Sequence, residues 1–264
     1  MPVCEYKGCA LNYWMDGPAN APLVVFTPGA FTDHTMFDAQ VGVVCQRYRM
    51  LRWDVRGHGL SRPSGLPFTT MQAAEDLAAL LDHVGYRRAA LVGQSIGGNI
   101  AQDFIFKYPD RCAATVLLGC TCSTLNLTWT ETLMLRLTPA IINLYPLNTF
   151  KRQAMMASAI TKEARERLLA MVEPLSADDV RNISLGIASA PHPEAGYKIT
   201  CPTMIAYGAH DDLGNIKKVA KRWADRDSAV GPIVIGRAGH VANMDNPVGF
   251  NRDMMEFLDS VYPS

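Results

Sequence analysis

The sequence predicts an α/β fold in which a mostly parallel central sheet is flanked by helices and carries an inserted helical cap. Short apolar runs, bounded by Gly, Pro or Asp, alternate along the chain with longer segments of helical periodicity. Strands that alternate with helices form parallel sheets with both faces covered. The alternation stops once, over residues 123–198, and a length of 264 residues suits one large domain of this kind.

Six runs predict buried strands because they are rich in apolar and β-branched residues. They are residues 23–27, 48–53, 89–92, 113–119, 203–207 and 232–235. Two earlier segments, 4–6 and 10–15, predict an N-terminal hairpin.

Helices are predicted between these runs. Thr69 and Gln72 form a capping box that opens a helix over 71–84, whose apolar residues share one face. A second helix starts just after Ser95 and stops before Pro109. A last helix follows Pro247 and completes the alternation.

The region that breaks the alternation predicts several helices and no convincing strand. One helix opens at the capping box of Ser176 and Asp179, and another lies near 161–171. The stretch 137–150 carries no charge and holds two prolines.

We expect residues 1–122 and 199–264 to form the core and 123–198 to form a helical cap inserted between core strands. We expect the uncharged stretch of this cap to act as a lid over a pocket, because open α/β sheets bind ligands at the carboxyl ends of their strands. The alternative is an insertion that packs on the core for stability alone.

The charge balance gives no reason to expect a nucleic-acid partner. Lys plus Arg and Asp plus Glu are both 25, so the formal net charge is zero and the chain has no overall basic field. The one candidate basic patch consists of Lys217, Lys218, Lys221 and Arg222, which we assign to the solvent-facing side of a surface helix. No run of 18 apolar residues predicts a membrane span.

The seven cysteines predict reduced thiols in a reducing compartment, the cytoplasm. Their number is odd, and the first residues lack the basic start and apolar segment of a secretory signal. Cys120 and Cys122 form a C-x-C pair, but no second Cys/His pair stands at zinc spacing. We interpret both as small core residues, and we predict no metal site and no cofactor.

The segment Gly93-Gln94-Ser95-Ile96-Gly97 matches G-x-S-x-G. A serine on a sharp strand-to-helix turn has a strained backbone, and the residues two positions away are too crowded for side chains. This segment follows a predicted strand and precedes a predicted helix, which is the context that the motif requires. Ser95 is therefore the candidate nucleophile.

A serine nucleophile needs a base, and the base needs an orienting acid. In this architecture the order along the chain is Ser, acid, His. Asp211 follows the predicted strand 203–207, and His240 follows the strand 232–235. Asp212 is the rival to Asp211, and the residues after the strand 113–119 offer no carboxylate.

Two backbone N–H groups are needed to stabilise an oxyanion. Ile96 supplies one at the start of a helix, where the dipole favours negative charge. Ala30 supplies the other, because Gly29 permits a tight turn after the strand 23–27. The apolar residues that we expect in the substrate pocket are Phe31, Met134, Leu137, Ile141 and Val241.

Five segments carry a family resemblance: PGAFTDHTMFDAQ, DVRGHGLS, GQSIGG, GAHDD and GHVANMDNP. In these segments the chain resembles the α/β-hydrolase fold serine hydrolases. The first three are similar to those of 3-oxoadipate enol-lactonase-like proteins and other fold-1 carboxylesterases. The resemblance covers everything except the insertion, for which it implies a helical cap over 123–198.

The same resemblance implies the triad Ser95, Asp211 and His240, an oxyanion hole from Ala30 and Ile96, and no cofactor. Pro28 stands where many relatives have His, which changes the stiffness of the loop but leaves Gly29 and the N–H of Ala30 in place.

These observations predict a serine hydrolase that cleaves a carboxylic ester or lactone of a small apolar substrate through an acyl-enzyme. One alternative is a hydrolase-like ligand receptor or binding protein on the same fold. Another is a cofactor-free perhydrolase or C–C bond hydrolase that uses the same triad. The expected partner in each case is a small molecule, and the sequence leaves the oligomeric state open.

Overall fold

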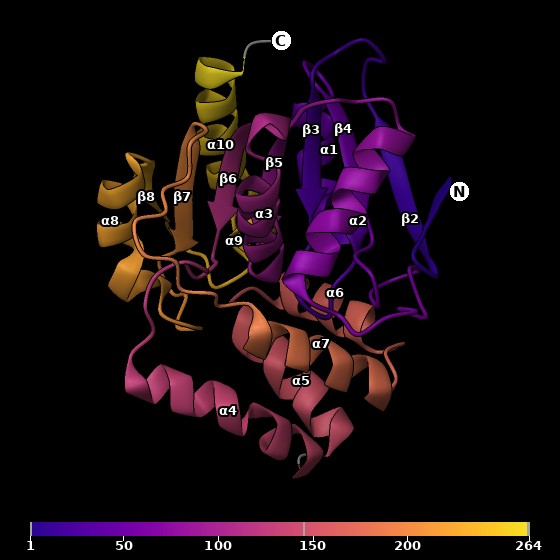
Figure 1. Ribbon diagram of the computed structural model, residues 1–264, viewed down its shortest axis with the longest axis vertical. Helices are drawn as coiled ribbons and strands as arrows, with labels where there is room; N and C mark the ends of the chain where they lie inside the picture. Colours follow the sequence, from indigo (N-terminus) through magenta and orange to yellow (C-terminus); the bar gives the residue numbers. More distant parts are fainter. Residues whose placement is uncertain (1, 145, 263–264) are drawn as a thin grey trace.

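A twisted, mostly parallel sheet lies at the centre of the protein in the computed structural model (Figure 1). The structure describes residues 2–144 and 146–262, without the side chains of 139–144. Within these residues the strands form one eight-stranded sheet in the order β1-β2-β4-β3-β5-β6-β7-β8. The strands are β1 (Val3–Tyr6), β2 (Cys9–Asp16), β3 (Leu23–Thr27), β4 (Arg49–Trp53), β5 (Ala89–Gln94), β6 (Cys112–Leu118), β7 (Thr203–Gly208) and β8 (Val230–Ile235).

The predicted α/β class is confirmed, and so is the N-terminal hairpin. β1 pairs with β2 and β2 pairs with β4 in antiparallel fashion, whereas all pairs from β4 to β8 are parallel. The helical segments are α1 (Asp38–Val44), α2 (Thr70–His83), α3 (Ile96–Lys107), α4 (Trp129–Leu144), α5 (Leu147–Ser158), α6 (Lys162–Val172), α7 (Ala177–Ser189), α8 (Ile216–Asp227), α9 (Ala242–Asp245) and α10 (Pro247–Val261), with short 3₁₀ segments η1 (His34–Phe37) and η2 (Pro109–Arg111).

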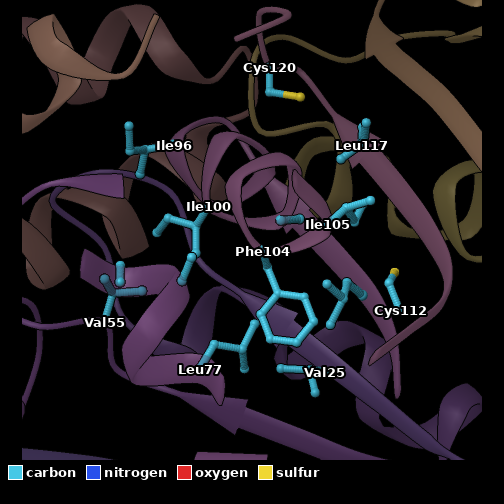
Figure 2. Close-up of a cluster of buried hydrophobic side chains, with 14 of the residues drawn as sticks. Val25, Val55, Leu77, Ile96, Ile100, Phe104, Ile105, Cys112, Leu117 and Cys120 are labelled. Atoms are coloured by element: carbon cyan, nitrogen blue, oxygen red, sulfur yellow. The ribbon is translucent and has the colours of Figure 1, made fainter. Parts of the chain in front are cut away.

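Two hydrophobic clusters cover the two faces of the sheet. Side chains of β3 alternate between them, since Val25 joins the first cluster and Val24 joins the second. The first contains residues of α2, α3 and α8, and Figure 2 shows Leu77 and Phe104 packed against Val25. The second contains residues of α1 and α10. Burial on both faces explains why the central strands are apolar throughout rather than alternating.

The helices α4–α7 follow β6 and precede β7, so the chain leaves the sheet and returns to it. They lie together at one end of the sheet (Figure 1), where α4 packs against α7 and α5 packs against α6. The capping box predicted at Ser176 and Asp179 opens α7. Among the described helices, none combines the length and apolarity needed to cross a bilayer.

The remaining expectations concern cysteines and basic residues. All seven cysteines are free thiols, and Cys120 and Cys122 are buried in the first cluster. The residues of the candidate basic patch lie exposed on α8: Lys217, Lys218, Lys221 and Arg222.

A buried ion pair fastens the loop after β4 to the sheet and to α2. The guanidinium of Arg56 donates to both carboxylate oxygens of Asp76, at 2.8 and 2.7 Å, and both side chains are fully buried. Arg56 also donates to the carbonyl oxygen of Tyr6 at 3.2 Å. The pair therefore holds the N-terminal hairpin, the loop and α2 in one arrangement.

We expect Arg56→Met to lower the free energy of unfolding by about 3–5 kcal/mol, because Asp76 would remain as an unpaired buried carboxylate. Urea denaturation measures the change. Lys162→Met is the control, since it removes an exposed ion pair with Glu166 and should shift stability by about 0.5 kcal/mol or less. Equal losses in the two variants would contradict a special contribution from the buried pair.

Candidate active site

Ser95 occupies a strained turn between β5 and α3. Its backbone angles are φ 52° and ψ −120°, a region that a residue with a side chain seldom adopts. The N–H of Ser95 donates to the carbonyl oxygen of Leu118 at 2.8 Å, which ties the turn to the end of β6. Strain of this kind persists only when the surrounding structure enforces it.

The glycines on either side of Ser95 are required by close backbone contacts. A Cβ atom added to Gly93 would lie 2.3 Å from the carbonyl oxygen of Gly97. A Cβ atom on Gly97 would lie 2.2 Å from the carbonyl oxygen of Thr27, at the end of β3. The turn therefore packs backbone against backbone, and this contact sets where Ser95 stands relative to the loop after β3.

Asp211 and His240 form a hydrogen-bonded pair. The Nδ1 atom of His240 lies 3.1 and 3.0 Å from the two carboxylate oxygens of Asp211, whose side chain is fully buried. A carboxylate only accepts hydrogen bonds, so Nδ1–H of His240 is the donor in this pair. The N–H of Leu213 also donates to Asp211, at 3.0 Å, and fixes the carboxylate.

The structure separates Asp211 from its rival Asp212. The side chain of Asp212 is 87% exposed and pairs with Lys217 at 2.8 Å. That ammonium group lowers the pKa of Asp212. Asp212 therefore makes a surface ion pair, whereas Asp211 faces His240.

One cavity of about 310 Å³ brings together Ser95, His240, Ala30 and Ile96. Apolar side chains form much of its wall: Phe31, Met155, Leu168, Ile187, Leu213 and Val241. Cys120 also faces the cavity, and burial raises the pKa of its thiol, so the group is neutral. Among the described residues that line the cavity, none is an Asp, Glu, Lys or Arg.

Ala30, in the loop after β3, and Ile96, in the first turn of α3, both line this cavity. Ile96 is the first residue of α3, where N–H groups have no partner within the helix. The turn that carries Ala30 is held by Thr32, whose hydroxyl donates to the carbonyl oxygen of Gly29 at 2.8 Å. Phe31 follows with φ 65°, which turns the chain sharply at the cavity wall.

Gln94 connects the turn at Ser95, the loop after β3 and the loop of His240. The sequence pattern gave no reason to select this residue. Its side-chain amide donates to the carbonyl oxygen of His240 at 3.0 Å. Its Oε1 atom occupies the space beside Gly29, where an added Cβ would come within 2.1 Å. The side chain of Gln94 thus contacts both the loop of His240 and the loop after β3.

The pocket predicted from the sequence needs correction. Phe31 and Val241 lie in the cavity wall, but Met134 and Leu137 do not. Both lie on α4, and they are 60% and 44% exposed. The cavity wall comes instead from α5, α6 and α7. The side chain of Ile141 lies outside the described residues.

One group of possible metal ligands exists among the described residues, formed by Asp33, His34 and Asp54. Asp54 accepts from Nδ1 and N–H of His34, both at 2.8 Å, and from the N–H of Leu60 at 2.7 Å. Asp33 accepts from the N–H of Thr35 and caps η1. These hydrogen bonds account for the cluster as a structural support of the loops around it.

Comparison with known proteins places the chain in a family. The family model described as the alpha/beta hydrolase family matches residues 24–253. The 3-oxoadipate enol-lactonase 2 of Acinetobacter baylyi is 32% identical over 117 residues, which cover 42% of this chain and 44% of that protein. The chain thus matches less than half of the length of this relative.

Two further comparisons cover nearly the whole chain. The 2-hydroxy-6-oxononadienedioate/2-hydroxy-6-oxononatrienedioate hydrolase of Burkholderia vietnamiensis is 29% identical over 94% of this chain and 90% of its own. A thermophilic esterase from Thermogutta terrifontis has a similar structure, with a TM-score of 0.84, 24% identity and coverage of 96% and 94%. At that identity, the structural likeness shows the fold.

We expect Gly97→Ala to destabilise the protein by about 1–3 kcal/mol, because the new Cβ would meet a backbone oxygen that cannot move aside cheaply. Gly42→Ala in α1 is the matched control, since an added Cβ there meets nothing within 4 Å. The control should gain up to about 1 kcal/mol from helix propensity. Thermal unfolding of both variants checks this, and similar changes in the two would contradict the crowding of the turn.

Proposed function

Since the chain belongs to the alpha/beta hydrolase family, we propose that it hydrolyses a carboxylic ester or lactone through an acyl-enzyme on Ser95. One observation carries this proposal. Ser95, at its strained turn after β5, and His240, which follows β8 and pairs with Asp211 after β7, line the same cavity. This set supplies a nucleophile, a base and an orienting acid for acyl transfer.

The first step is attack of Ser95 Oγ on the carbonyl carbon of the substrate. Nε2 of His240 takes the hydroxyl proton, and the N–H groups of Ala30 and Ile96 stabilise the oxyanion. The protonated imidazole then gives its proton to the leaving alcohol. Asp211 holds Nδ1–H and stabilises the imidazolium while it exists.

The second step releases the acid. Water takes the place of the alcohol, His240 accepts a proton from it, and hydroxide attacks the acyl carbon. The tetrahedral intermediate collapses, and Ser95 regains its proton. No metal or cofactor enters either step as we propose it.

We propose a small apolar substrate, and we propose that residues 123–198 act as a cap over it. The volume of about 310 Å³ suits a small molecule, and α5, α6 and α7 of this insertion supply Met155, Leu168 and Ile187 to the wall. Such a wall favours uncharged acyl groups because a buried charge would have no partner there. The free thiols support a reducing location such as the cytoplasm.

We expect Ser95→Ala to lose about 10⁶-fold in kcat on p-nitrophenyl esters and to resist labelling by a fluorophosphonate probe. The control is Ser184→Ala, because Ser184 is a buried serine of α7 that donates to Val180 and lies outside the cavity. Labelling of Ser95→Ala at another serine would contradict the proposed nucleophile. Binding of esters by wild type without turnover would favour the ligand-receptor alternative.

We expect Asp211→Asn to lower kcat by about 10⁴-fold, because the amide allows the wrong imidazole tautomer. Asp212→Asn removes an exposed carboxylate of the same type from the next position, and its effect should be that of an ordinary surface change. Steady-state kinetics on one activated ester compare the two. A large loss in Asp212→Asn with nearly normal Asp211→Asn would reverse the assignment.

A further inference from the structure

One carboxylate joins the insertion to the loop that carries His240, and the mechanism above does not use it. Asp245 in α9 accepts the N–H of Gly239 at 2.8 Å, directly beside His240. It also accepts the N–H and the hydroxyl of Thr161, at 2.9 and 2.7 Å. The N–H of Ile160 lies 3.1 Å from both of its oxygens. Four donors from two separate segments therefore meet on one side chain.

Three of these donors belong to the corner between α5 and α6, residues 159–161. A second bond fixes the same corner, because the N–H of Val241 donates to the carbonyl oxygen of Ser158 at 3.1 Å. Gly239 allows the two segments to come close, since a Cβ there would lie 3.2 Å from both Asp245 Oδ2 and the carbonyl oxygen of Ser158. The corner and the loop of His240 are thus in direct contact.

The two helices that meet at the corner supply part of the cavity wall. Met155 and Ser158 line the cavity from the last turn of α5, immediately before the corner. Leu168 lines it from α6, which starts immediately after the corner. A hydrogen-bonded corner therefore sets the distance between these side chains and His240.

Other bonds hold the insertion elsewhere. Arg167 of α6 donates to the carbonyl oxygen of Thr35 at 2.6 Å, and Asn182 of α7 accepts the N–H of Phe68 at 2.9 Å. Neither of these bonds reaches the loop of His240. Asp245, in contrast, forms hydrogen bonds both to the corner and to the loop of His240.

We propose that Asp245 is a positioning residue that sets the acyl specificity of the site, by holding the α5–α6 corner against the loop of His240. The proposal rests on the proposed ester or lactone hydrolysis. A wall held at a fixed place distinguishes acyl chains by length, since one methylene in an apolar pocket changes rates about 10–200-fold. A wall that moves loses this discrimination.

The first measurement is amide hydrogen exchange, which needs no enzymatic activity. Asp245→Asn keeps the shape but leaves one acceptor oxygen and turns an NH₂ group toward the donors. We expect peptides covering residues 155–165 to exchange at least tenfold faster in this variant than in wild type. Asp225→Asn is the control, because Asp225 is an exposed carboxylate of α8 that pairs with Lys221.

The second measurement is kcat/KM on p-nitrophenyl esters of increasing acyl length. We expect the ratio between the preferred ester and the acetate ester to fall about tenfold in Asp245→Asn and to stay unchanged in Asp225→Asn. Partial unfolding lowers all rates by one factor and leaves this ratio alone. If Asp245→Asn does not fold, Thr161→Val removes one donor and should shift the ratio in the same direction, and Thr161→Ser should restore it.

Three outcomes overturn the proposal. Unchanged exchange over residues 155–165 shows that Asp245 does not hold the corner. Faster exchange with an unchanged ratio, or a wild type with no preference for acyl length, shows that the corner does not set specificity. If wild type hydrolyses no ester and no probe labels Ser95, the proposed function has failed, and the exchange data still decide whether Asp245 holds the corner.

Discussion

The contact between the turn at Ser95 and the end of β3 is the constraint on which the rest of the site depends. Gly93 leaves room for the backbone of Gly97 within the turn, and the missing side chain of Gly97 lets the turn lie against Thr27 at the end of β3. The loop after β3 then reaches the same cavity as Ser95 and Ile96. Gln94 extends this contact to the loop of His240. The crowded turn therefore brings three segments that lie far apart in the sequence into contact: the turn at Ser95, the loop after β3 and the loop of His240.

The order of the strands explains how the Asp211–His240 pair lies relative to this turn. β6 separates β5 from β7 and β8, so the residues that follow β6 lie between Ser95 and the pair. Gly119 occupies that point with φ 57°, and a Cβ there would lie 3.2 Å from Asp211 and 3.4 Å from Nδ1 of His240. Gly119, at the end of β6, therefore leaves room for the Asp211–His240 pair and supplies no side chain to the site.

The fold was predictable from the sequence because burial on both faces leaves long apolar runs, and the runs alternate with amphipathic helices. The turn at Ser95 was predictable because its crowding demands glycine at fixed spacing. The spacing alone left Asp211 and Asp212 open, since two carboxylates follow one strand. The family resemblance pointed to Asp211, and the local backbone directs that carboxylate toward His240.

The pocket was the least predictable part of the site. The sequence pointed to the uncharged stretch 137–150 as the wall of the pocket. Helical periodicity, however, predicts only which side of a helix is buried, and it does not predict whether that side packs on the core or faces a cavity. Met134 and Leu137 of α4 turned out to be exposed, whereas the last turn of α5, in a helix with polar and charged positions, faces the cavity. Gln94 and Asp245 contact loops through side-chain hydrogen bonds, for which a sequence has no periodic signal.

Because α4–α7 separate β6 from β7 along the chain, the sheet is completed late while the protein is being synthesised. Synthesis runs from the N-terminus, so the strands up to β6 and the turn at Ser95 leave the ribosome before β7 and β8 exist. β6 then exposes the edge that later pairs with β7, where Thr115 lies opposite Thr203. During translation of α4–α7 this edge is an unpaired apolar strand, the kind of surface that chaperones and aggregation partners bind. The same delay keeps Ser95 apart from Asp211 and His240 until the last strand has been made.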